Sequence, residues 1–439
     1  MPVRSLCYDL QLLTMPTPSL LIVPARFKSG KLYSQIPTSG AGDFTVTRAT
    51  NATRVNASGL IESVASGIPR LDYFASDGTV GCPALLVEPS GTNFARGVEL
   101  LNTPTPATAS GGITITTGST DFLAPDGSSG TITKYVGGTA SGANFVEYVS
   151  SISVSASGVH TFSAFVKTGA TNPLTFCALQ FALYSAASGT NTSYFNLASG
   201  TALTAGATIQ NYGNGWYRII SAPYTIAAGD LAGSIRLIFA EANNDVNWPA
   251  SGALDLTVYA WGIQLEAGSV ATSYIPTTTG SVTRNADVVS VTGAVSGSIG
   301  QTQGTIYAEV DVRNLFAGSL LVVDDGDTSD FIAIGRLANL TIRAQIRRAG
   351  GSTTTIITSS AVALGVHKIA LAYTNGDYAL YIDGVSAGTS TNSTNYPATS
   401  LTQCVLSNTN YVPFNDRILD AALYTTRLSN AELAALTSL

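Results

Sequence analysis

The chain has 439 residues, more than one ordinary hydrophobic core needs, so two or three domains are expected. Only 11% of the residues are charged. The formal net charge is −6, and the 21 Lys and Arg form no basic cluster, so the electrostatic footprint of nucleic-acid binding is absent. No apolar stretch is long enough to cross a membrane, which argues against membrane insertion. Small and hydroxylated residues dominate, which favours strands and turns over amphipathic helices.

Residues 1–96 contain only brief apolar runs between prolines and turn residues, such as Phe44–Thr47 and Pro83–Pro89. Pieces this short cannot bury a core of their own. We therefore expect residues 1–96 to form an irregular attachment region that packs on the next domain or on neighbouring subunits.

Strand patterns recur at short intervals in residues 97–285, for example in Gly158–Lys167 and Gly215–Ile220. Many short strands between Gly, Ser and Asn turns, with no helical pattern, predict a two-sheet sandwich. Phe162 and Phe165 fall on opposite faces of one strand, so both faces are expected to be covered.

Residues 286–439 alternate in the same way and form a third unit. Asn375-Gly376 and Asp383-Gly384 are strong signals for tight turns between strands. The one helix signal lies at the end, where Ser429 fits an N-cap and Glu432 completes a capping box. The prediction is an all-β chain with two tandem β-sandwich (jelly-roll) domains, preceded by an irregular region and ending in one short helix.

Eight sequence fragments occur in an order that resembles tailed-phage virion proteins with a carbohydrate-binding-like jelly roll. They are Thr47–Glu62, Pro69–Tyr73, Leu86–Asn93, Ala124–Lys134, Thr161–Gly169, Asn214–Arg218, Trp261–Gly268 and Thr283–Val288. Residues 286–439 resemble a concanavalin-like lectin/glucanase (laminin-G-like) sandwich, through His367–Tyr373, Tyr381–Gly384 and Leu419–Leu433.

The resemblance implies a structural virion protein, either a fibre, a spike or a capsid-attached appendage, assembled in the host cytoplasm. It implies a homotrimer that binds other virion proteins through residues 1–96 and touches host-surface glycans. Two alternatives stay open: a purely structural decoration or connector without a ligand, and, less favoured, a polysaccharide-degrading enzyme.

The best candidate for a catalytic site is the strand face that carries Glu309, Asp311 and Arg313. These residues share one face because each is two positions from the next. Glucanases with a similar sandwich use an alternating acidic strand with a third acid, and here Arg313 takes that place. We expect Arg313 to hold both acids as ionised partners, and we predict no catalytic residues. His160 and His367 match no ligand or triad spacing and are expected to pack or to lie at the surface.

Sugar recognition needs aromatic rings that stack on pyranose faces, together with polar side chains. Trp248 is the best candidate because it lies in a polar stretch, and its predicted partners in binding are Asn244, Asp245 and Asn247. The alternative is that Trp248 caps the edge of the sandwich. The other two tryptophans, Trp216 and Trp261, lie inside strand patterns and are predicted core residues.

One dense acidic run could hold a metal ion: Asp324, Asp325, Asp327 and Asp330 offer hard oxygen ligands for calcium. The alternative is a solvated hairpin turn, because Asp, Gly and Ser are ordinary turn residues. No other cofactor is expected. The four cysteines, Cys7, Cys82, Cys177 and Cys404, lie far apart and are expected to be free or buried thiols.

Overall fold

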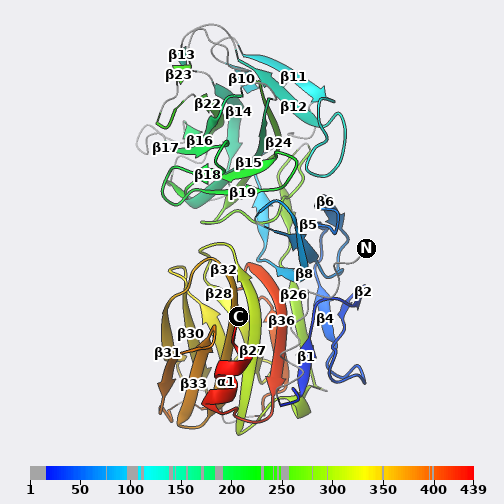
Figure 1. Ribbon diagram of the computed structural model, residues 1–439, viewed down its shortest axis with the longest axis vertical. Coiled ribbons are helices and arrows are strands. Elements are labelled where there is room, and N and C mark those ends of the chain that lie inside the picture. Colours follow the sequence, from blue (N-terminus) through cyan, green and yellow to red (C-terminus); the bar gives the residue numbers. More distant parts are fainter. Residues whose placement is uncertain are drawn as a thin grey trace.

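The computed structural model describes residues 16–75, 77–95, 107–109, 113–137, 142–143, 145–154, 157–169, 173–182, 191–228, 232–240, 242–244, 247–248, 257–278, 280–293, 295–348, 351–394, 396–397 and 400–439. Within these residues the fold is nearly all β, with one α-helix, α1 (Asn430–Leu436). Two sandwiches lie end to end along the long axis, which we call the upper and the lower sandwich (Figure 1).

The upper sandwich is a jelly roll of two antiparallel sheets. One sheet has the order β11 (Thr114–Ser119), β12 (Ile132–Val136), β24 (Thr257–Ala267), β15 (Gly158–Thr168), β20 (Tyr217–Ile220) and β19 (Thr208–Asn211), with β21 (Tyr224–Ile226) also on β15. The other has the order β10 (Ala107–Ala109), β14 (Phe145–Ser153), β22 (Ala232–Ala240), β16 (Phe176–Ala182), β17 (Asn191–Asn196) and β18 (Thr201–Ala202). A separate pair joins β13 (Gly142–Ala143) to β23 (Asn247–Trp248).

The lower sandwich also has two antiparallel sheets. The first has the order β34 (Val385–Ser390), β33 (Asp377–Ile382), β32 (Gly365–Thr374), β27 (Gln303–Val312), β36 (Asp416–Tyr424), β8 (Val80–Val87) and β7 (Leu71–Phe74), with β1 (Leu20–Ile22) also on β36. The second has the order β2 (Phe27–Lys28), β3 (Lys31–Leu32), β4 (Phe44–Thr47), β26 (Val288–Thr292), β35 (Gln403–Ser407), β28 (Gly318–Asp324), β29 (Phe331–Arg336), β30 (Thr341–Arg347) and β31 (Thr354–Ala361).

The N-terminal strands belong to the lower sandwich, which differs from the predicted order of three consecutive units. Leu20 pairs with Leu423, and Val46 pairs with Val289. Both sheets of the lower sandwich would otherwise expose an unpaired edge, and the short N-terminal runs satisfy the backbone groups there. The jelly roll is therefore inserted between two parts of the chain that fold together.

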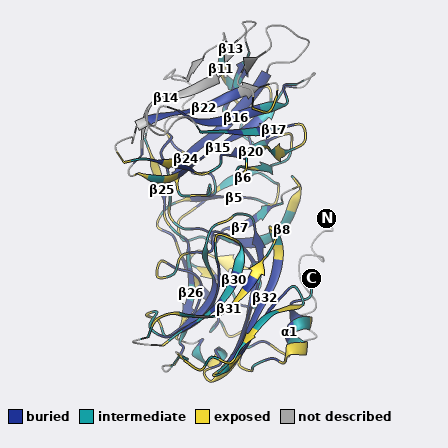
Figure 2. Cartoon of the chain, turned by 90° about the vertical axis from the view of Figure 1, so that its left-hand side faces the viewer, coloured by how far each residue is buried: buried dark blue, intermediate teal, exposed yellow. Residues whose placement is uncertain are grey.

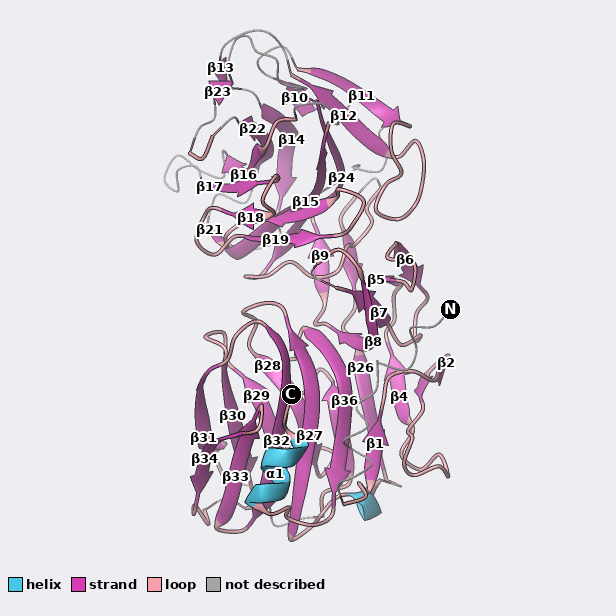
Figure 3. Ribbon diagram, in the orientation of Figure 1, coloured by secondary structure: helices cyan, strands magenta, loops and turns pink. Residues whose placement is uncertain are grey.

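A hairpin, a pair of strands that are far apart in the sequence and a short 3-10 helix also lie outside the sheets of the two sandwiches. β5 (Ala52–Val55) pairs with β6 (Ile61–Val64), β9 (Gly91–Asn93) pairs with β25 (Val282–Arg284), and η2 covers Ser296–Ser298. The β5–β6 hairpin and β9 lie between the two sandwiches along one side of the molecule, and β7 and β8 lie at the end of the lower sandwich that faces them (Figure 3).

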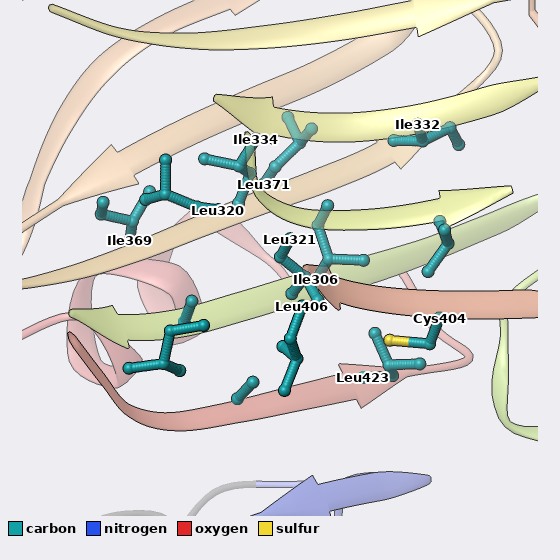
Figure 4. Packing of buried hydrophobic residues seen from close by; sticks show 14 of the residues in the cluster. Ile306, Leu320, Leu321, Ile332, Ile334, Ile369, Leu371, Cys404, Leu406 and Leu423 are labelled. Carbon is teal, nitrogen blue, oxygen red and sulfur yellow. The ribbon is translucent and has the colours of Figure 1, made fainter. Parts of the chain in front are cut away.

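The core of the lower sandwich is made of branched aliphatic side chains from both sheets (Figure 4). Ile306 and Leu371 from one sheet meet Leu321 and Ile334 from the other, and each of these side chains is 1% exposed or less. In the upper sandwich, Figure 2 shows buried residues along β15 and β22.

Local signals in the sequence were confirmed. Asn375-Gly376 joins β32 to β33, and Asp383-Gly384 joins β33 to β34 with positive φ at both residues, which the tight turn requires. The Ser429 hydroxyl accepts from the Glu432 backbone N–H in a capping box. Leu433 and Leu436 then pack the helix on the outer face of the first sheet of the lower sandwich.

The expectation of four free thiols is wrong at Cys82, which is disulfide-bonded. Cys177 and Cys404 are free and buried, while Cys7 lies outside the described residues. Within the described part of the chain, no helix is long and apolar enough to cross a membrane.

Candidate functional site

A hydrophobic cluster joins the jelly roll to the segment that runs between the sandwiches. Phe165 of β15 and Trp261 of β24 point away from the jelly-roll core, with ring centroids 5.3 Å apart. Tyr274 packs against Trp261 with ring centroids 4.5 Å apart and the ring planes tilted by 47°, and Phe74 of β7 joins the same cluster. The prediction that both faces of the β15 strand are covered is therefore confirmed, because Phe162 lies in the jelly-roll core.

A buried network of five charged residues lies beside this cluster. Arg70 has no exposed side-chain surface; it donates to Glu88 at 2.7 Å and also to Asp287. Arg48 donates to Asp287 at 2.9 Å, and Arg284 lies 3.4 Å from Glu88. Each of these residues comes from one of the sequence fragments that carried the resemblance, so the network ties the N-terminal segment to the chain that follows the jelly roll.

The electrostatics of this network favour the charged forms. Burial raises the pKa of Glu88, but the charges of Arg284 and Arg70 outweigh that effect and lower it to about 2. The Ser273 N–H and hydroxyl also donate to Glu88, at 2.6 and 2.7 Å. Glu88 is therefore ionised in the folded protein and anchors the chain that leaves the jelly roll.

The segment after β24 is fixed by buried hydrogen bonds. The Asn93 amide donates to the carbonyls of Ile263 and Ile275, at 3.1 and 2.9 Å. Glu266 accepts from the Thr272 N–H at 2.9 Å and from its hydroxyl at 2.6 Å, and burial raises the pKa of the Glu266 carboxyl. Residues 269–274 thus form a rigid strap across the junction.

A cleft of about 570 Å³ lies between the two sandwiches. Its walls come from the β5–β7 region, from residues 206–223 and the 269–274 strap of the jelly roll, and from residues 313–315 and 415–417 of the lower sandwich. Leu315 and Leu364 line it and are 49% and 53% exposed. The volume lies in the range of small-molecule sites, and the walls combine apolar surface with polar groups.

Arginines supply much of the charge on the cleft walls. The Arg313 guanidinium lies 4.7 Å from the Phe74 ring centroid, and its Nε donates to Asp311 at 2.7 Å. Arg417 pairs with Asp311 at 3.1 Å and with Asp72 at 3.3 Å. These contacts hold two guanidinium groups in fixed positions before any ligand binds.

A third arginine, Arg218 of β20, is only 3% exposed and also lines the cleft. Its Nη2 donates to the Ser163 hydroxyl at 3.0 Å, and its guanidinium lies 5.4 Å from the Phe165 ring centroid. Burial raises the pKa of Tyr212, and the nearby positive charge of Arg218 opposes that increase.

The carboxylates that line the cleft are already engaged. Burial raises the pKa of Asp416 to about 7, yet its oxygens accept from Arg336 Nη1 at 2.8 Å, the Arg313 N–H at 3.1 Å and the Asn314 amide at 3.0 Å. Three donors on one carboxylate favour its ionised form. A glycosidase needs two carboxylates free to act on the substrate, so this arrangement suits binding better than hydrolysis.

The proposed acidic strand face is divided between two neighbourhoods. Asp311 pairs with Arg313, as predicted. Glu309 instead lies between Lys368 of β32 and Asp420 of β36 in the sheet register. His367 Nε2 donates to the Ala363 carbonyl at 2.9 Å, and its Nδ1 hydrogen-bonds with the Asp383 carboxyl at 2.6 Å. His160 is buried, and its Nδ1 lies 3.0 Å from the Gly158 carbonyl oxygen.

The predicted sugar-binding stretch lies at the far end of the jelly roll from the cleft (Figure 1). Asn247 and Trp248 form β23, which pairs with Gly142 and Ala143. Asn244 is exposed with a φ of 60°. Asp245 and the side chains of Asn247 and Trp248 lie outside the described residues, so binding there stays a prediction. Trp216 and Trp261 are 2% and 4% exposed and are core residues, as predicted.

The acidic run forms a hydrogen-bonded turn between β28 and β29. Asp324 is buried and accepts from the Tyr411 hydroxyl at 3.0 Å. Asp325 and Asp327 accept from the Ser329 hydroxyl, at 2.7 and 2.6 Å, and Asp330 is buried. Within the described chain, no group of three or more His, Cys, Asp or Glu side chains is placed to hold a metal ion. Calcium binding stays a prediction.

No pattern in the sequence indicates the cleft. Three residues of the cleft lie in fragments that carry the family resemblance. Arg218 ends the Asn214–Arg218 fragment, and Arg54 and Asp72 lie in two others. The sequence feature that could have indicated the cleft is Arg218 inside an otherwise apolar strand. A charge buried in such a strand requires either a counter-charge or a ligand.

Comparisons with known proteins agree with the fold. A family model described as the concanavalin A-like lectin/glucanases superfamily matches residues 283–434. No curated protein matches the chain. The chain is similar to Ruminococcus gnavus IT-sialidase CBM40 bound to alpha2,6 sialyllactose, with 20% identity over 33% of this chain and 88% of that chain and a TM-score of 0.29.

It is also similar to domain 4 of AbnA, a GH43 extracellular arabinanase from Geobacillus stearothermophilus, in complex with arabinotriose. That match has 16% identity over 38% of this chain and 82% of that chain, with a TM-score of 0.29. A heptameric SAP-like pentraxin from Limulus polyphemus matches with 11% identity over 30% and 69% of the two chains and a TM-score of 0.25. The residues that the family model matches, 283–434, supply most strands of the lower sandwich, and this match agrees with the concanavalin-like domain that the sequence resemblance predicted.

Proposed function

We propose that the protein binds glycans without cleaving them and that the cleft between the sandwiches is the binding site. The observation that carries this proposal is the cleft itself, whose fixed guanidinium groups stand beside two exposed leucines, Leu315 and Leu364. A saccharide presents both C–H faces and hydroxyl acceptors, so it matches walls of this mixed character.

The wider role that we propose is that of a virion fibre, spike or capsid-attached appendage that contacts host-surface glycans as a homotrimer. The support for this role is the order of the sequence fragments. Residues 20–87 supply strands to the lower sandwich, so attachment to other virion proteins would use surfaces of that domain rather than a separate N-terminal unit. Detection of the protein in purified particles, and a solution mass of about three times 45.2 kDa, would test this role.

The binding proposal is tested with a double variant, Leu315→Ala with Leu364→Ala, on an array of host-surface glycans. Each leucine should contribute about 1 kcal/mol when a sugar face covers it, so removing both should weaken binding by about 2 kcal/mol, or about 30-fold. Leu123→Ala is the matched control, because Leu123 is 60% exposed and lies outside the cleft lining.

Wild-type protein that binds no glycan would overturn the proposal. If the double variant binds glycans as well as the wild type does, the binding site lies elsewhere than in the cleft. Equal losses in the double variant and in Leu123→Ala would indicate a non-specific effect.

A further inference from the structure

The structure buries six arginines within its described residues: Arg48, Arg70, Arg218, Arg284, Arg336 and Arg417. Five of them lie within ion-pair distance of a carboxylate. Arg218 is the exception among these six, and it lines the cleft. A buried guanidinium without a counter-ion costs free energy, so its persistence needs an explanation.

Among the described residues, the side chains in direct contact with Arg218 are neutral. They are the Ser163 hydroxyl, the Phe165 ring and the Tyr212 side chain. Its Nε has no hydrogen-bond partner among the described residues. The charge of Arg218 acts to lower the pKa of Glu266, but the Glu266 oxygens accept hydrogen bonds from Thr272 and Gln264 and not from Arg218.

Two more unpaired donors line the same cleft. Arg313 Nη1 and Asn415 Nδ2 are buried and have no hydrogen-bond partner within the described chain. The lining carboxylates, in contrast, are occupied: Asp72 pairs with Arg417, and Asp416 with Arg336. The cleft is therefore lined by residues whose buried donor atoms are unsatisfied, and a ligand that reaches and satisfies these atoms must bring acceptors.

We infer that the cleft takes an acidic saccharide whose carboxylate pairs with Arg218, an assignment that rests on the proposed glycan-binding function. A carboxylate is planar and accepts two parallel bonds from one edge of a guanidinium, which makes it a stronger partner than a neutral hydroxyl. Arg313 and Asn415 would then donate to the remaining oxygens of the sugar.

The test is a glycan array in which each carboxylated glycan is printed beside its own methyl ester, together with neutral and sulfated glycans. Wild-type protein should bind carboxylated glycans and lose about 10- to 100-fold in affinity on esterification, the size expected for a charged hydrogen bond. Arg218→Gln should lose the same factor and no longer distinguish acid from ester, while Arg218→Lys should retain part of the preference.

Arg236→Gln is the matched control, because Arg236 lies on the other jelly-roll sheet and donates to Gln180 at 3.2 Å. A thermal melt separates binding from folding. Loss of an uncompensated buried charge should leave the melting temperature of Arg218→Gln unchanged or higher, whereas a structural role for Arg218 predicts a lower one.

The outcomes are distinct. Binding of neutral glycans with esters as good as acids overturns this inference and leaves the proposed function standing, and a preference confined to sulfated glycans also overturns it. An Arg218→Gln variant that melts lower and keeps its preference for acids overturns it as well. An array with no bound glycan overturns both proposals.

Discussion

Replacing Arg70 by Met should break the buried network at the junction. The side chain of Arg70 has no exposed surface and donates to Glu88 at 2.7 Å, to Asp287, to the Ser273 hydroxyl at 2.9 Å and to the Thr53 carbonyl at 3.1 Å. Met fills a similar volume without the charge, so the change isolates the loss of the ion pairs.

Two routes give the magnitude. Removing one partner of a buried ion pair typically costs about 3–5 kcal/mol, because the other charge stays buried. Independently, the pKa of Glu88 is lowered to about 2 from its usual 4.5, and that difference corresponds to about 3 kcal/mol of favourable interaction with its partners. We therefore expect a loss of about 3 kcal/mol or more in the free energy of unfolding.

Tryptophan fluorescence during urea and thermal unfolding is the assay, since Trp216 and Trp261 both lie in the cluster that faces the junction. At about 2–4 °C per kcal/mol, the melting temperature of the Arg70→Met variant should fall by roughly 10 °C. The control is Arg54→Met: the Arg54–Glu62 pair is partly exposed and should contribute under about 1 kcal/mol. Equal, small effects in both variants would refute the reasoning.

Four further predictions follow from single residues. Because the folded-state pKa of Glu88 is lowered to about 2, its contribution to stability is complete above about pH 4.5 and is lost as the pH falls toward 2. Urea midpoints at pH 6, 4 and 3 measure this loss, and a midpoint that does not change with pH would contradict it. Ser429→Ala should cost about 1 kcal/mol of stability through the lost helix cap, seen as a lower urea midpoint. Glu309→Gln should not change sugar release from host polysaccharide, because we expect none from the wild type. Trp248→Ala should weaken adsorption to host cells about tenfold with an unchanged melting temperature if its loop binds glycans; a lower melting temperature with unchanged adsorption would indicate a structural cap.

The parts of the fold that depend on near neighbours could be predicted from the sequence. The turn at Asp383-Gly384 and the capping box of Ser429 involve residues within four positions of each other, so their pattern is visible in a short window. The opposite faces of Phe162 and Phe165 follow from the two-residue period of a strand.

The N-terminal strands could not be placed in this way. Leu20 pairs with Leu423, and nothing in the short run Leu20–Ile22 specifies a partner so distant in the sequence. A free strand edge accepts any extended segment of suitable length, so topology rather than local pattern decides the pairing. For the same reason, a deletion through Pro83 would remove strands from both sheets of the lower sandwich and would not leave an intact pair of domains.

The sequence does not reveal the candidate site, because its charged residues lie far apart in the chain and meet only in the fold. Arg70, Glu88 and Asp287 stood in separate fragments, and only the fold brings them within hydrogen-bond distance. In the sequence, Arg218 is one residue of a strand pattern. Only the fold shows that it has no carboxylate of the described residues within ion-pair distance, whereas the other five buried arginines do.

The junction and the cleft depend on the same segments, so the binding site that we propose would lie where the two domains meet. Asp72 and Glu88 line the cleft, and both pair with buried arginines that also hold the lower sandwich or the exit of the jelly roll. Because those pairs are inaccessible to solvent, they hold the walls at a fixed separation, and ordering the site costs little when a ligand arrives. If the cleft is the binding site that we propose, the stability of the junction is a condition for recognition, and the unpaired donors buried in its walls select the ligand.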